Sequence, residues 1–318
     1  MNEFELFQLR NFVNQMPGLP GVQRNDANET AILAQKLEHI KSKVYEVKYP
    51  LLKARTLIPV ESDVHPGAMT IAYEVDDIVG EAQWASNEND EPPFADVNAV
   101  KVTTNVQILT SAYRYSMFDL QASAMAGVPL EQKRANAARK IIEHGLEKTA
   151  ALGVSRLGLQ GLYTSSTSTV TAAAGAWSGL TEAQILGELN ALITGIAVDT
   201  NEVQQATTIV LPIAAHSRIR TLKSGVDSGE TVLSFFLKTN PTVKEVVSWV
   251  YGNTAGALGV TRAVAYAKDP DVLTLEIPQE FTAMAAQLHN YSWRVPCFMK
   301  TAGVSIKQPK AIRYLDGC

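Results

Sequence analysis

Cysteine is scarce in this chain of 318 residues, which contains only Cys297 and Cys318. Two cysteines so far apart predict neither a disulfide framework nor a zinc site. The five histidines show no HExxH spacing and no pair at helical distance, so we expect no bound metal and no cofactor. Apolar runs are short as well. None approaches the roughly 18 residues of a membrane span, and the N-terminus lacks the basic and apolar segments of a secretory signal.

Catalytic signatures are equally weak. The three glycines between positions 153 and 161 follow a predicted helix, whereas a dinucleotide-binding loop needs a strand before its glycines and a helix after them. Ser62, Asp63 and His65 are near neighbours in one predicted turn, where the spatial geometry of a catalytic triad is rarely formed. Cys297 follows a proline in an apolar strand without a nearby base. We therefore expect no enzyme activity.

Excess positive charge is absent too. The formal net charge is -4, which excludes a strongly basic nucleic-acid binder, because such a protein needs Lys and Arg to replace phosphate counterions. Contact with nucleic acid should then be weak and non-specific. Hydrophobic residues make up 46% of the chain, enough for a sizeable core in one or two domains, while charged residues make up only 19%. That low charged share suits a surface that neighbouring molecules cover.

Between Thr56 and Val100 the chain has ten carboxylates and no Lys or Arg. Apolar and polar residues alternate at both margins of this segment, at Ile71–Val75 and Val100–Val106, which predicts two strands of a hairpin. The stretch between them, Gly80 to Ala99, is rich in Pro and Asn. A hairpin with such a long tip cannot bury its own apolar residues. The sequence therefore predicts an acidic arm that lies on another copy of the chain.

The strongest helix signal extends from Pro129 to Leu152, about 36 Å at 1.5 Å per residue. One side of this helix is apolar and the other has more cations than acids. Mixed charge on a long helix often serves solubility alone, but the excess of cations, with Lys101 and Arg114 on its approaches, could also receive the acidic arm. Under that hypothesis the contacts between subunits comprise arm acids and helix cations: Glu74, Asp76, Asp77, Glu81, Glu88, Asp90, Glu91 and Asp96 with Arg134, Arg139 and Lys140.

The remaining segments predict an α+β fold. Positions 1–50 look like an arm followed by a helix, and a Ser, Thr, Ala and Gly-rich stretch at Thr164–Ser178 marks the passage to a second part of the body. In that part we expect two helices and three strands: helices at Thr181–Val198 and Pro212–Ser224, and strands at Thr207–Leu211, Val246–Val250 and Val264–Ala267. Three further strands should follow, at Leu273–Ile277, Tyr291–Lys300 and Val304–Tyr314.

Two stretches carry a family resemblance: Tyr45–Pro50 with its continuation through Lys53 to Val60, and Gly303–Ile312. Both resemble one family of tailed-phage major capsid proteins, which are similar to the Hong Kong 97-type fold. The order of elements is the stronger part of this resemblance. It implies an N-terminal arm and helix (1–50), a peripheral domain (51–72, and 102–160 with a spine helix at 129–152), an extended loop (73–101), an axial domain (161–271) and strands that return to the peripheral domain (272–318).

The resemblance implies a major capsid protein that assembles as hexamers and pentamers into an icosahedral shell around double-stranded DNA. Its expected partners are copies of itself, a portal and possible scaffolding or decoration proteins. Its expected location is the virion, after assembly in the host cytoplasm. The fold's namesake joins its subunits through a lysine on the extended loop. The loop of this chain has no lysine before Lys101, so that cross-link is not expected here.

The chain also lacks about a hundred N-terminal residues that some relatives use as a scaffold, which implies a separate scaffolding protein or none. Two alternatives stay open at this point. One is an encapsulin-like bacterial nanocompartment shell that encloses a cargo enzyme, and the other is an unrelated α/β enzyme. A nanocompartment would need a groove for a cargo peptide, and no such groove is recognisable in the sequence.

Overall fold

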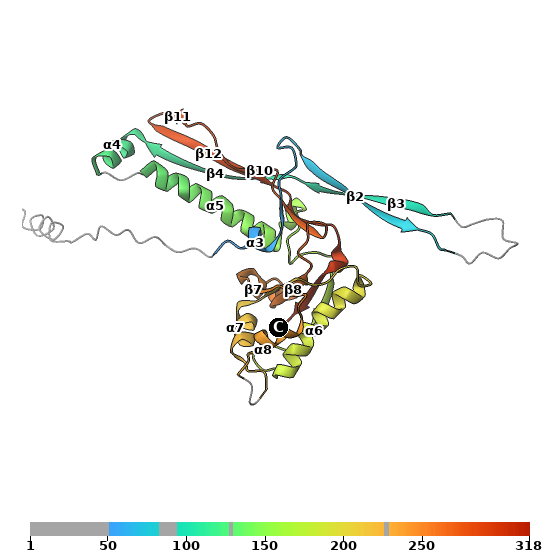
Figure 1. Ribbon diagram of the computed structural model, residues 1–318. Coiled ribbons are helices and arrows are strands. Elements are labelled where there is room, and N and C mark those ends of the chain that lie inside the picture. Colours follow the sequence, from blue (N-terminus) through green and yellow to red (C-terminus); the bar gives the residue numbers. More distant parts are fainter. Residues whose placement is uncertain (1–50, 83–93, 127–129, 226–228) are drawn as a thin grey trace, which may run out of the picture. The chain divides into compact units, whose positions relative to one another are not determined.

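The computed structural model describes residues 51–82, 94–126, 130–225 and 229–318 (Figure 1). By its internal contacts the chain divides into two units, Met1–Pro50 and Leu51–Cys318. The predicted N-terminal arm and helix therefore lie outside the described residues. Among the residues that are described, no helix combines the length and hydropathy that crossing a membrane requires.

The long helix α5 packs on a four-stranded antiparallel sheet (Figure 1). The elements are α5 (Leu130–Leu152), β4 (Gln107–Ser116), β10 (Gln279–Ala283), β11 (Gln287–His289) and β12 (Ser292–Thr301). Ala138, Ile142 and Leu146 repeat every four residues, so they lie on one face of α5 and are buried. The long helix predicted from Pro129 to Leu152 is thus confirmed from Leu130 onward.

Strands β4 and β12 pair along their whole lengths, from Ser292 opposite Ser116 to Thr301 opposite Gln107. Tyr115, Val295 and Cys297 point to the core beneath α5. Because side chains alternate between the two faces of a strand, the positions between these residues lie on the opposite face of the sheet. Helix α4 (Met117–Ala126), which the sequence did not predict, follows β4 directly.

The predicted hairpin is present as β2 (Thr70–Val79) and β3 (Asp96–Asn105). Their register places Ile71 opposite Thr104 and Val79 opposite Asp96. The strands are longer than the alternation indicated, because backbone hydrogen bonds extend the ladder through residues that bury no side chain. Within the described residues neither strand pairs with a third strand.

A second, mixed sheet has the strand order β5-β14-β8-β6-β7. Its strands are β5 (Thr169–Ala172), β6 (Thr208–Leu211), β7 (Glu245–Ser248), β8 (Arg262–Tyr266) and β14 (Ile312–Asp316), and the helices of the same region are α6 (Glu182–Asp199), α7 (Ile213–Thr221) and α8 (Val232–Thr239). Thr181 caps α6 in a capping box with Gln184, as its position before an apolar stripe predicted. Helix α8 had no counterpart in the prediction.

This sheet separates two hydrophobic cores. Val264 and Tyr266 of β8 face the core shared with α5, whereas Ala263 and Ala265 face the core of α6, α7 and α8. The residues of β8 face two different cores because successive side chains of a strand alternate between its two faces. Both faces of the central strands are therefore buried, which explains why β6 is buried along its entire length and is apolar after Thr208.

A third, small sheet joins β1 (Val60–Glu61), β9 (Leu273–Glu276) and β13 (Gly303–Ile306). The single strand predicted at Val304–Tyr314 is wrong, because the 3-10 turn at Pro309–Ala311 divides it into β13 and β14. A proline cannot donate a ladder hydrogen bond, which ends β13 before this turn. The short helix α3 (Ala54–Leu57) and the 3-10 turns at Ser155–Leu157, Val250–Asn253 and Ala257–Gly259 complete the described elements.

The C-terminal strands do not all return to the sheet under α5. Strand β12 does, but β14 pairs with β8 and β5 in the five-stranded sheet. Strands β9 and β13 also pair outside that sheet, in the small third sheet, and the domain bounds expected for residues 272–318 stay a prediction. Ile312 and Tyr314 of β14 are buried in the core that also contains the apolar face of α5. Tertiary packing therefore decides where β14 pairs.

A buried carboxylate joins three segments of the chain. Glu147 on α5 is only 4% exposed, and its oxygens accept hydrogen bonds from the Lys53 amide (2.8 Å), the Ala54 amide (2.9 Å) and the Trp249 indole (2.9 Å). A buried carboxylate without such donors would be strongly unfavourable. Here the carboxylate of Glu147 accepts hydrogen bonds from the backbone amides at the start of α3. It also connects α5 and α3 to Trp249, in the segment that follows β7.

Candidate functional site

The hairpin carries the acidic surface that the sequence predicted. The side chains of Glu74, Asp76, Glu81 and Asp96 are exposed. The side chain of Asp77 is not described, and Glu88, Asp90 and Glu91 lie outside the described residues. Lys101, counted among the possible receptors, belongs to the hairpin itself and lies opposite Glu74 on the neighbouring strand. Beyond this pair, all the charged side chains in the described part of the arm are therefore acidic.

Exposed apolar side chains lie on both faces of the hairpin. Val75 lies opposite Val100, and nearer the tip Ile78 lies opposite Val97. Positions 75 and 78 differ by an odd number, so the two pairs project from opposite faces. Val79 shares the face of Val75 and is exposed too, so the distal half is apolar on both faces.

The base of the hairpin is anchored on its own chain. The Tyr73 hydroxyl donates a hydrogen bond to the Ile306 carbonyl at 2.9 Å, and burial raises the pKa of Tyr73. A groove of about 390 Å³ separates the remaining base residues from the body, with Val102 on one side and Val304 and Pro309 on the other. Toward the tip, Ile78 is 80% exposed and Phe94 is 92% exposed. The distal half has no such anchor among the described residues and is left for a partner to cover.

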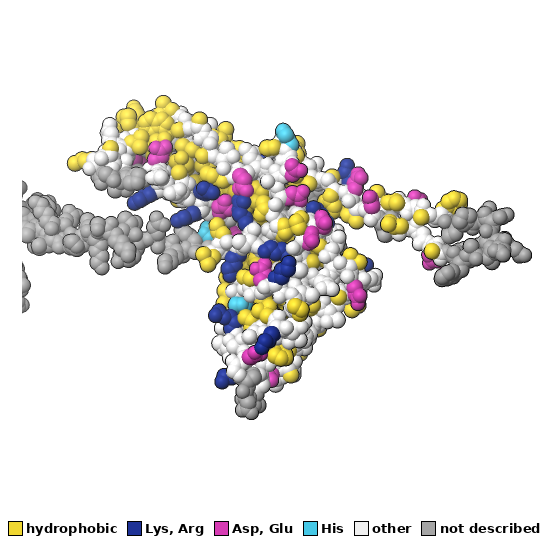
Figure 2. Space-filling model, in the orientation of Figure 1, with side chains coloured by type: hydrophobic (Ala, Val, Ile, Leu, Met, Phe, Trp, Pro, Cys, Tyr) yellow, Lys and Arg dark blue, Asp and Glu magenta, His cyan; other side chains and the backbone are white. Residues whose placement is uncertain are grey.

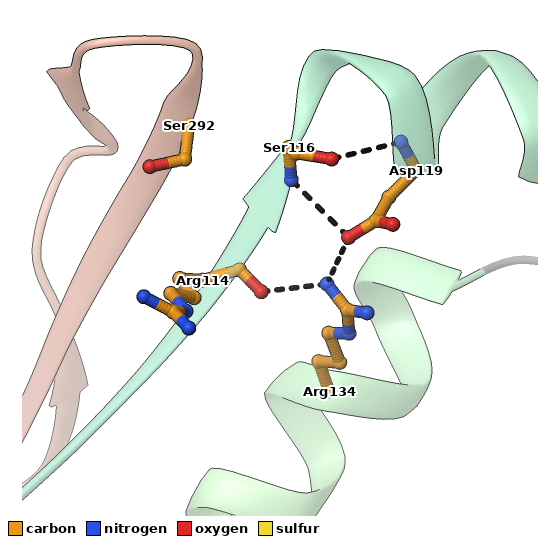
Figure 3. A pocket seen from close by; sticks show the side chains of 5 residues that line it. All are labelled: Arg114, Ser116, Asp119, Arg134 and Ser292. Atoms are coloured by element: carbon orange, nitrogen blue, oxygen red, sulfur yellow. Dashed lines mark hydrogen bonds and ion pairs between the residues drawn. The ribbon is translucent and has the colours of Figure 1, made fainter.

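Arg134, one of the predicted receptors, already has partners within the chain (Figure 3). Its guanidinium donates to the Arg114 carbonyl at 2.6 Å and to Asp119 Oδ2 at 3.0 Å. Asp119 also completes the cap of α4, since it accepts from the Ser116 amide and donates its own amide to the Ser116 hydroxyl. The Ser116 amide and Arg134 together hold the pKa of Asp119 below its usual value.

The other two predicted receptors line a groove of about 660 Å³ beside α5, with Arg139 over the Phe281 ring at 5.9 Å and Lys140 next to it. In this groove Arg55 holds Glu280 through two hydrogen bonds of 2.7 and 2.8 Å and reaches Glu143 at 3.4 Å. The bonds from Arg55 lower the pKa of Glu280. The groove is therefore already populated by opposite charges from this chain, and the pairing of Arg134, Arg139 and Lys140 with the acidic arm stays a prediction.

The structure shows a pair of cations that the sequence analysis did not recognise. Arg114 of β4 and Arg294 of β12 lie directly opposite each other, and both are exposed. Arg114 had been counted only as an approach to the helix. The pair could not be found earlier because the two residues are 180 positions apart and the register of β4 against β12 is not readable from either segment alone.

The residues considered for catalysis have ordinary roles. His65 Nδ1 accepts a hydrogen bond from the Gly67 amide at 3.0 Å within a turn. Cys297 and Cys318 are buried free thiols, and burial raises the pKa of Cys318 to about 12, which disfavours its reactive thiolate. Within the described part of the chain, no three His, Cys, Asp or Glu side chains gather where they could hold a metal ion.

Solved capsid structures share this fold. The chain resembles the capsid protein of Myoviridae phage XM1 with a TM-score of 0.80 at 17% identity, covering 94% of this chain and 100% of that one. It also resembles the capsid of an empty GTA particle (TM-score 0.63, 12% identity, 93% and 99% covered) and a virus-like particle from Pyrococcus furiosus (TM-score 0.55, 13% identity, 82% and 90% covered). The expected α+β, Hong Kong 97-type fold is thereby confirmed.

A family model described as major capsid protein matches residues 80–318, three quarters of the chain, and the chain belongs to this family. The prediction of a major capsid protein is confirmed. No curated protein matches the sequence. The functional surface to be sought is therefore the one through which copies of the chain contact each other.

Proposed function

We propose that copies of this chain assemble into hexamers and pentamers that close into an icosahedral shell around the double-stranded DNA of a tailed phage. The observation that carries this proposal is the hairpin, whose distal half is exposed on both faces while its base is anchored to the body. An exposed two-stranded ribbon is marginal in water, and a neighbouring subunit supplies the cover that it needs.

The comparisons support a phage shell over an encapsulin-like compartment. The family model that matches is that of a major capsid protein, and the capsid of phage XM1 matches the chain with a TM-score of 0.80 over 100% of its own length. The enclosed DNA is held without sequence specificity, in keeping with a net charge of -4.

In this proposal the shell also contacts a portal and, where the phage encodes them, scaffolding or decoration proteins. It forms in the host cytoplasm and ends in the virion. Its subunits are held non-covalently, since no lysine lies between positions 54 and 100 to form a loop cross-link and both cysteines are buried. Purified shells should run as single-chain bands on a denaturing gel. Bands of linked subunits that survive boiling and reductant would contradict non-covalent assembly.

Electron microscopy of the purified protein tests the proposal directly. We expect closed shells from the full chain, and nuclease-resistant DNA in shells recovered from infected cells. A matched variant replaces residues 80–95 by Asn-Gly, which keeps Val79 opposite Asp96 and closes the hairpin with a two-residue turn. This variant should fold but should not build stable shells. Shells of normal stability from it would show that the distal hairpin has no part in assembly.

A further inference from the structure

The acids of α5 all have partners within the chain. Glu131 accepts a hydrogen bond from the Tyr115 hydroxyl at 3.4 Å, and Glu143 pairs with Arg55 at 3.4 Å. Glu147 is buried and accepts the three hydrogen bonds described above. The carboxylates of this helix are therefore engaged with other elements of the chain.

The lysines of α5 lie on a different side of the helix. Positions 133, 137, 140, 144 and 148 are three or four residues apart, so they form one row along its axis. This row is opposite to the buried face that contains Ala138, Ile142 and Leu146. It contains no carboxylate, and its members are Lys133, Ala137, Lys140, His144 and Lys148. We call it the lysine row, and Figure 2 shows Lys and Arg side chains along α5.

The two end members of the lysine row have no partner in the described part of the chain. Lys133 and Lys148 are exposed, and neither makes a hydrogen bond or an ion pair with a described residue. Lys140 lies between them and has an interaction of its own. Asp and Glu outnumber Lys and Arg by 32 to 28 in the whole chain, so a face without acids does not follow from composition. The mixed charge of a helix face that serves only solubility is missing here.

The lysine row fits a polyanion better than it fits a protein. Ile141, which is 63% exposed, is a single apolar neighbour at its margin, and a single exposed apolar residue is ordinary on a protein surface. Protein partners are anchored by buried apolar and aromatic side chains, and exposed charge pairs alone contribute little to such contacts. A phosphate backbone needs only cations, because its binding is driven by the release of counterions.

The length of the lysine row suits a DNA duplex. Lys133 and Lys148 are 15 positions apart in the sequence, which is about 22 Å along a helix. A duplex presents one phosphate charge per about 1.7 Å, so about 13 charges face this distance. Lysine carries a point charge on a flexible stem and can reach a phosphate without a fixed register. The row can therefore contact DNA of any sequence.

We propose that the lysine row faces the inside of the shell and contacts the phosphates of the enclosed DNA. The proposal rests on the proposed shell function and names the surface through which the DNA is held. Because α5 packs on the four-stranded sheet, that sheet then lies between the lysine row and the outside of the shell.

Lysine modification tests the contact in the assembled protein. DNA-filled shells and empty shells are treated with an acetylating reagent, and mass spectrometry identifies the modified lysines. Lys133 and Lys148 should react more slowly in filled shells than in empty ones, because DNA covers them. Lys101 on the hairpin is the control and should react equally in both. Equal rates at Lys133 and Lys148 in the two samples would overturn the proposal, and if both lysines are unreactive even in empty shells, a protein segment covers the row instead.

The salt dependence of DNA binding by unassembled subunits gives a second test. Lys133→Gln with Lys148→Gln removes two phosphate contacts, so the slope of log affinity against log salt concentration for a short duplex should fall by about 2. The matched control, Lys101→Gln with Lys223→Gln, removes two exposed lysines from other parts of the chain and should leave the slope unchanged. Fluorescence anisotropy measures binding, and circular dichroism checks that each variant is folded. The same slope for the Lys133 and Lys148 variant as for the unaltered chain would contradict the proposal.

These outcomes separate the lysine row from the proposed function. Absence of shells, or shells without DNA in infected cells, would overturn the proposed function. DNA-filled shells in which Lys133 and Lys148 react as fast as in empty shells would overturn only the lysine row as the DNA contact.

Discussion

The hairpin and the five-stranded sheet are both built from β-strands, but their side chains have opposite environments. Every residue of β3 except Thr104 is exposed, whereas every residue of β6 is buried. Both strands contain valine, so residue type does not explain the difference. A strand buried on both faces by its own chain contributes to folding. A strand exposed on both faces contributes only when another molecule covers it, and this division organises the expected effects of substitution.

The largest expected contrast compares two isoleucines truncated in the same way. Ile209→Ala removes a fully buried side chain of β6 and should lower the free energy of unfolding of the subunit by about 2–5 kcal/mol. Ile78→Ala removes an 80% exposed side chain of β2 and should change it by less than about 0.5 kcal/mol. Urea denaturation of unassembled subunits measures both. Equal losses would mean that the hairpin is part of the folding unit.

A second prediction concerns the buried carboxylate that joins the body. Glu147→Ala leaves the Lys53 and Ala54 amides and the Trp249 indole without their acceptor, and should cost about 3 kcal/mol of folding stability. Gln132→Ala, on the exposed start of the same helix, is the control and should cost well under 1 kcal/mol. Denaturant midpoints compare them. A small loss at Glu147 would show that water replaces these bonds readily.

The hydrogen bond of Tyr73 anchors the hairpin to the body of the subunit. Its loss should have an intermediate effect on stability that is confined to the hairpin. Tyr73→Phe removes the hydrogen bond to the Ile306 carbonyl, worth about 1 kcal/mol. We expect faster hydrogen exchange in β2 and β3 and unchanged exchange in β6 and β8. The comparison would fail if the five-stranded sheet lost protection to the same degree.

The smallest effect should depend on pH. Glu276 lies opposite Glu61 on a parallel strand. Burial raises the pKa of Glu276, and the nearby charge of Glu61 raises it by a smaller amount. A hydrogen bond from Thr274 opposes the shift. The raised pKa means that Glu276 favours the folded state at low pH, when it is protonated, and that this contribution is lost as pH rises through its folded pKa.

Glu276→Gln tests that sign. The variant should gain stability over the unaltered chain as pH rises above the folded pKa of Glu276, and the two should converge in acid. Thermal melting across this range is the measurement. A gain in acid that disappears at neutral pH would reverse the assignment.

Sequence patterns were sufficient where a segment's own periodicity decides its structure. The spacing of Leu130, Ala138 and Leu146 predicted α5, although Ile141, expected on the same face, is 63% exposed. The position of Thr181 before an apolar stripe predicted the start of α6, and the alternation around Val75 and Val100 predicted the hairpin. Each of these signals is local, since helix and strand periods are read from consecutive residues. The acidic surface of the arm followed from composition alone.

Tertiary structure decided everything that depends on which distant segments meet. The pairing of β14 with β8, the opposition of Arg114 and Arg294, and the use of Arg134 by Asp119 each join residues that no local pattern connects. The sequence contained all the charges but not their partners, because side-chain neighbours across strands are set by register and packing. The cations of α5 were therefore the candidates that a local pattern offered for the arm. Arg114 and Arg294, for which no partner lies among the described residues, are neighbours only through the register of β4 and β12.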